Sequence, residues 1–98
     1  MTSISSLQND LDLWNEKSQT ATDDAKKHIV NAANYNANGY ADKAQMESNA
    51  AADKENKSSD YTAKAKEIAG MIESMEQEAR QLESQINDLQ DKLARITG

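Results

Sequence analysis

Residues 61–96 read YTAKAKEIAGMIESMEQEARQLESQINDLQDKLARI, and their spacing decides the fold. Apolar or small residues and one tyrosine recur along this stretch at steps that alternate between four and three without interruption. They are Tyr61, Ala65, Ile68, Ile72, Met75, Ala79, Leu82, Ile86, Leu89, Leu93 and Ile96. No charged residue falls on this heptad stripe, so the pattern predicts one long amphipathic helix that packs against a partner helix.

The composition predicts a single all-α domain, residues 1–98, with a thin core. Hydrophobic residues make up 37 % of the 98 residues, but fifteen of them are alanine, and Phe, Pro and Cys are absent. Such a composition suits helices that each bury one narrow stripe. We therefore expect an antiparallel helical hairpin or coiled coil.

Charge and hydropathy exclude two classes of partner. The net charge of −6 argues against nucleic acid, because phosphates require clustered Lys and Arg. The longest uninterrupted apolar run, residues 68–72, is far too short to span a membrane. Residues 1–4 lack the charged-then-apolar pattern of a signal peptide. We expect a protein that is cytoplasmic as synthesised, and its export would need a signal-peptide-independent route.

The first half of the chain predicts a helix at about 4–34. Its large apolar residues step by three or four, and the same spacing continues through alanine, serine and one histidine. Residues 35–59 then form a connection, or they contain a short middle helix. A last helix follows at about 60–97 and carries the heptad stripe.

Two positions for the chain reversal remain open at this point. Asn38 and Gly39 are typical of a helix stop, because asparagine competes for backbone hydrogen bonds and glycine adopts a left-handed conformation. The polar run DKENKSSD, residues 53–60, is the other candidate turn. In that case the last helix would be capped by Ser58, Ser59 or Asp60.

The flanks of the stripe favour an antiparallel partner within the chain. Parallel pairing of two copies would place Glu78 against Glu83, a like-charge contact, with no opposite-charge contact in return. An antiparallel hairpin can set Trp14 opposite Ala79, so that large residues meet small ones, and it leaves the last two stripe positions overhanging. A second register covers this end but opposes Ala21 to Ala79.

Every version of the hairpin leaves apolar surface uncovered, so we expect an oligomer or a helical protein partner. The predicted interaction residues are Leu7, Leu11, Trp14, Ile68, Ile72, Met75, Leu82, Ile86, Leu89, Leu93 and Ile96. Among them, Trp14 is either an anchor between the two helices or a binding hot spot for a partner, since tryptophan is enriched in both settings.

The sequence predicts no enzyme, no cofactor and no metal. His28 is the only histidine, and its nearest acids, Asp23 and Asp24, do not lie at a ligand spacing on one helical face. The chain has no glycine loop that could bind phosphate and no cysteine nucleophile. The acidic clusters are interpreted as solvated helix faces.

In size, acidity and hairpin architecture the chain resembles small components, chaperones or substrates of bacterial specialised secretion systems, of the type III or WXG100 kind. It carries Asn36-Ala37-Asn38-Gly39 where the WXG100 family has a Trp-x-Gly turn. The resemblance implies a helical interaction protein that self-assembles or binds a helical partner. A cytoplasmic chaperone that covers a client helix and a passive structural spacer, such as a phage or filament part, are the alternatives.

Overall fold

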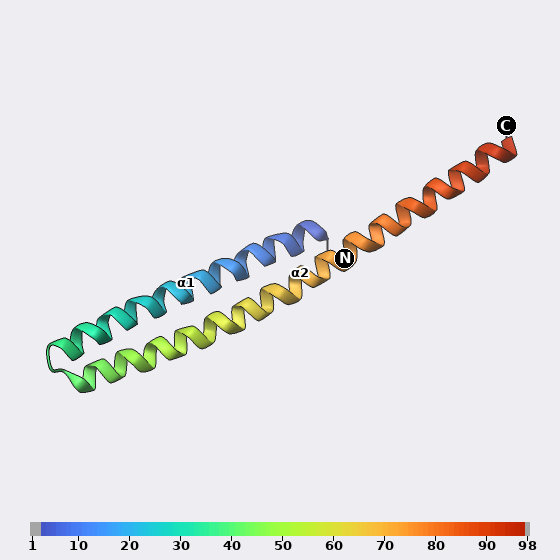
Figure 1. Ribbon diagram of the computed structural model, residues 1–98. Coiled ribbons are helices and arrows are strands. Elements are labelled where there is room, and N and C mark those ends of the chain that lie inside the picture. The colour runs from blue at the N-terminus through green and yellow to red at the C-terminus, as the bar shows by residue number, and fades with distance from the viewer. Residues whose placement is uncertain (1–2, 98) are drawn as a thin grey trace.

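The chain folds into an extended antiparallel helical hairpin, as the sequence predicts. A computed structural model describes residues 3–97 and contains α1 (Ile4–Ala37) and α2 (Ala41–Thr97), with no strand in that range. The two helices run side by side for the whole length of α1, and α2 then continues alone (Figure 1). The molecule measures 88 × 17 × 13 Å, so it is a thin rod.

A short turn at Asn38–Tyr40 reverses the chain. Gly39 has a φ of +81°, a left-handed conformation that glycine adopts without a steric penalty. The Tyr40 amide donates to the Tyr35 carbonyl at 2.8 Å, and the Gly39 amide donates to the Asn36 carbonyl at 3.1 Å. These two bonds satisfy the last carbonyls of α1, which is the usual way in which a glycine ends a helix.

The structure thus places the turn at the first of the two candidate positions. Residues 53–60 are helical, and residues 35–59 contain no separate middle helix, because α2 is continuous from Ala41. The predicted helix caps at Ser58, Ser59 and Asp60 are therefore wrong. The polar run contains neither glycine nor proline. Its Ser58 and Lys54 lie on the seam, which is the line of contact between α1 and α2, so tertiary contacts keep the run helical.

The register also differs from both predicted ones. Residues at similar distances from Gly39 face each other: Trp14 lies 25 residues before Gly39 and packs against Tyr61, 22 residues after it, with ring centroids 5.7 Å apart, and not against Ala79. Ala21 likewise does not face Ala79, which is exposed beyond the end of α1. Both predicted registers require a reversal further along the chain than residues 38–40, and the short turn excludes them.

The seam between the helices changes character along the hairpin. Near the start of α1, Leu7, Ile68 and Ile72 form a buried cluster, and Ile4, Leu11, Trp14 and Met75 pack around it. Towards the turn, the buried positions are all small: Ala21, Ala25 and Ala32 on α1, and Ala44, Ala51 and Ala65 on α2. Alanine lets the two backbones approach closely, so dispersion contacts replace bulky side chains there.

Replacing Leu7 by alanine is expected to lower the free energy of unfolding by about 2–3 kcal/mol, because it leaves a cavity between Ile68 and Ile72. The matched control is Leu13→Ala on the same helix, where the leucine is 47 % exposed and a change below about 1 kcal/mol is expected. Urea unfolding followed by circular dichroism measures both. Equal losses in the two variants would contradict the placement of the core.

Alanine substitutions at Gly39 and Gly70 are expected to change the stability of the hairpin in opposite directions. Gly39→Ala should lower stability by about 1 kcal/mol or more, because alanine is strained at a φ of +81°. Gly70→Ala should raise it by up to about 1 kcal/mol, since Gly70 lies inside α2 and an added methyl group meets nothing within 4 Å. Thermal unfolding of the two variants measures the signs. A stabilising Gly39→Ala would show that the turn is placed wrongly.

Candidate interaction surface

Nothing in residues 3–97 packs against the C-terminal part of α2. Met75 is the last stripe residue that packs against the cluster at the start of α1, and α2 then projects alone as far as Thr97 (Figure 1). We call residues 76–97 the tail. Six stripe positions lie on it and all are exposed: Ala79, Leu82, Ile86, Leu89, Leu93 and Ile96, which we call the uncovered stripe.

The uncovered stripe continues the buried seam of the hairpin. The same seven-residue spacing leads from Ala65 and Ile72, both at most 7 % exposed, to Ile86, which is 52 % exposed. The sequence pattern is unchanged across Met75, and only the covering helix is missing. A helical face that is buried wherever a partner reaches it is thus left open where α1 does not extend.

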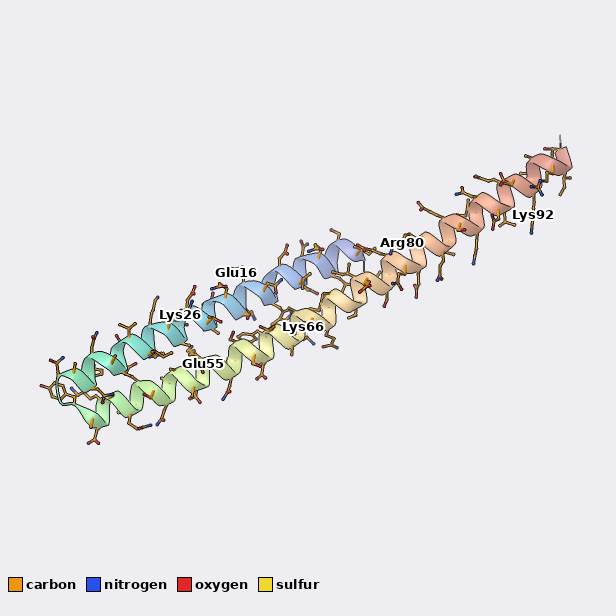
Figure 2. The ribbon with its side chains drawn as sticks, viewed as in Figure 1. Glu16, Lys26, Glu55, Lys66, Arg80 and Lys92 are labelled. Atoms are coloured by element: carbon orange, nitrogen blue, oxygen red, sulfur yellow. The ribbon has the colours of Figure 1, made fainter. Side chains whose placement is uncertain are left out.

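The other faces of the tail are polar and carry both signs of charge. Arg80 and Lys92 project from it into solvent (Figure 2), and Arg95 is a third base. Five acids also lie on the tail: Glu76, Glu78, Glu83, Asp88 and Asp91. Five acids against three bases leave a net charge of −2, small enough for a second acidic helix to approach.

The structure divides the predicted interaction residues into two groups. Leu7, Leu11, Trp14, Ile68, Ile72 and Met75 pack together within the hairpin. Leu82, Ile86, Leu89, Leu93 and Ile96 are between 52 and 81 % exposed. Only the second group is available to another molecule while the hairpin is closed.

Trp14 belongs to the first group and acts as an anchor between the helices. Its ring packs against Tyr61, and the Lys17 ammonium lies 4.7 Å from the ring centroid. The indole is therefore partly buried by the tilted tyrosine ring and also makes a cation–π contact. The alternative role for Trp14, a hot spot for a partner, would require this packing to open.

A cluster of hydroxyl groups crosses the middle of the seam. The Ser18 hydroxyl lies 2.7 Å from that of Thr62 and 3.2 Å from that of Ser58, and the Thr22 hydroxyl lies 2.7 Å from that of Ser58. Each of these hydroxyl groups therefore has a hydrogen-bond partner, including those of the half-buried Ser18, Thr22 and Ser58. Heptad spacing places Ser18 and Ser58 on the seam, but it does not reveal that they meet.

Two contacts between titratable side chains lie between this cluster and the turn. The His28 Nδ1 atom is 2.5 Å from a Glu47 carboxylate oxygen, and the Lys54 ammonium is 3.7 Å from Asp24. His28 is thus paired across the seam by a residue that sequence reasoning did not connect with it. Within residues 3–97, no group of three or more His, Cys, Asp or Glu side chains could hold a metal ion.

The hairpin tip carries a small aromatic cluster. Tyr35 and Tyr40 meet edge to face with ring centroids 6.4 Å apart, and the Lys43 ammonium lies 5.2 Å from the Tyr40 centroid and 5.8 Å from the Tyr35 centroid. The rings hold the two ends of the turn together. This cluster therefore serves the reversal of the chain.

Comparisons with known proteins add no relationship: no protein-family model, curated protein or solved structure matches this chain. Neither α1 nor α2, as described over residues 3–97, combines the length and apolarity needed to cross a bilayer.

The tail should exchange its amide hydrogens faster than the rest of α2 when nothing covers it. A helix without tertiary contacts is only marginally stable in water, whereas residues 44–75 pack against α1. We expect at least about tenfold lower protection for residues 79–96 than for residues 44–75 in dilute protein, measured by hydrogen exchange with mass spectrometry. Uniform protection along α2 in a monomer would contradict this assignment.

Proposed function

We propose that this chain is a non-enzymatic interaction protein that associates with a helix, from another copy or from another protein, through the uncovered stripe. The observation that carries the proposal is the exposure of five large apolar side chains on one helical face, directly in line with a buried seam. A contiguous apolar face of this kind on a small protein is typical of a protein–protein interface.

The free energy available on this face is sufficient for association. Full burial of a Leu or Ile side chain contributes roughly 1.5–3 kcal/mol, and the five residues are 52 to 81 % exposed, so most of their surface is still open to a partner. Covering them would contribute on the order of 5 kcal/mol, and the partner's apolar face would contribute a similar amount. The sum exceeds the lower estimates of the cost of holding two molecules together.

Two pairs of titratable side chains across the seam support a non-enzymatic role. The only histidine is already paired with Glu47, and Lys54 is paired with Asp24 on the seam. General acid–base catalysis requires such groups to reach a substrate, and these contacts occupy them between the helices. Their role in the proposal is to hold the hairpin together.

The shape of the molecule supports placing it among the helical components or clients of a specialised secretion system, cytoplasmic as synthesised. The resemblance in size and hairpin architecture suggests this setting. A chaperone that covers one client helix is the second candidate, and it is favoured by the uncovered stripe being a single face on one helix. A passive spacer would use the 88 Å length of the rod and leave the stripe without a role.

The test is isolation of the protein from its native source, followed by mass determination of the intact complex. We expect a complex with the unmodified chain and its loss on Ile86→Asp, because a charge would then be buried in the middle of the stripe. Ser84→Asp is the matched control, since it adds the same charge to an exposed position on the opposite face of the tail.

A complex that survives Ile86→Asp would show that binding uses another surface, and recovery of the unmodified chain only as a monomer would exclude stable association. Circular dichroism of both variants verifies that the hairpin still forms. The substitutions lie outside the region that α1 covers, so the hairpin should be retained.

A further inference from the structure

We infer that the partner of the uncovered stripe is the same stripe of a second copy, running antiparallel, so that two rods join tail to tail. The inference rests on the proposed function, because it assumes that the stripe is an association surface. Three features of the structure select this partner and this direction: the order of residues along the stripe, the position of α1, and the charges beside the stripe.

The stripe is self-complementary when it is reversed about a point between Ile86 and Leu89. Ile86 then meets Leu89 of the second copy, Leu82 meets its Leu93, and Ala79 meets its Ile96. By symmetry each layer occurs twice, which gives six layers, all of them apolar. Ala79, the smallest residue of the stripe, thus faces Ile96, which is 81 % exposed and is the most exposed large side chain of the stripe. All six stripe positions find a partner, and no layer extends into the part of α2 that α1 covers.

The position of α1 disfavours the parallel alternative. α1 lies against the same stripe from Ala44 to Met75, directly before the uncovered part (Figure 1). In a parallel pair, both α1 helices would have to fit between the two α2 helices just before the paired region, which would force the α2 helices apart there. In the antiparallel pair the two hairpins lie at opposite ends, and each α1 is followed along the stripe by the tail of the second copy.

The charges beside the stripe also favour antiparallel over parallel pairing. One flanking row of the tail reads Glu78, Gln85, Lys92, and antiparallel pairing runs this row against its own reverse. The acidic end of each row then lies nearest the basic end of the other, which is favourable. The other row places its two acids nearest to Gln90 and Thr97 of the second copy, so like charges do not meet. Parallel pairing would instead bring Glu78 beside Glu83.

The first measurement is the mass of the purified full-length chain by sedimentation equilibrium up to about 100 µM, a range that detects micromolar association. We expect a monomer–dimer equilibrium. Ile86→Asp should raise the dimer dissociation constant by roughly 100-fold or more, because the residue occurs in two layers of the dimer. Ser84→Asp should change it by less than about fivefold. A monomer at all concentrations, or an assembly other than a dimer, overturns the inference.

The second measurement determines the direction. The chain has no cysteine, so a single spin label can be attached at Gln77→Cys or at Asp91→Cys, both exposed on the face opposite the stripe. In the antiparallel register, two labels at position 77 are 21 residues apart along the axis, or about 30 Å. Two labels at position 91 are 7 residues apart, or about 10 Å. In a parallel pair neither position gives an axial offset.

Dipolar spectroscopy that finds a clearly longer distance for the position 77 label than for the position 91 label supports the inference. Equal distances for both labels overturn it, and so does a longer distance for position 91. Failure here is distinguishable from failure of the proposed function. A native complex that contains another protein and is lost on Ile86→Asp would retain the stripe as an interface while excluding the second copy as its partner.

Discussion

The reversal at Asn38–Tyr40 determines which part of the long heptad stripe is covered. Gly39 ends α1 in a left-handed conformation, and three residues are too few to allow an offset of a full heptad between the helices. Residues at similar distances from the turn therefore face each other. Since α1 has 34 residues and α2 has 57, the difference appears at one end only, as the tail. The turn thus creates both the hairpin and the surface left outside it.

The hairpin holds its register with few large side chains. Its alanines would pack almost as well after a shift of one heptad, since Ala44, Ala51 and Ala65 all lie on one seven-residue repeat, in which Ser58 takes the remaining position. The polar contacts would not survive that shift, because His28 would move from Glu47 towards Lys54 and would lose its carboxylate partner. Half-buried polar pairs thus specify one alignment where the apolar packing alone is permissive.

The heptad spacing was sufficient to predict the all-α hairpin, the long second helix and an uncovered apolar end. It was not sufficient to locate the turn, because residues 53–60 resemble a loop in composition and become helical only through contacts of Lys54 and Ser58 with α1. The wrong register followed from matching large to small residues, a criterion that several alignments satisfy. The pairing of His28 with Glu47 depends on the register and so was not visible beforehand.

α1 covers one part of the heptad stripe of α2 and leaves the other part to a partner, which limits how copies of the chain can assemble. A heptad seam that is open along its whole length can slide, and it can recruit further chains in staggered register. Here α1 occupies the seam from Ala44 to Met75, so an incoming helix has only the tail to pair with. An isologous contact between two tails uses the same patch on both copies and therefore closes at two. In this interpretation α1 limits the length of the interface, and the rod forms a defined pair instead of a filament.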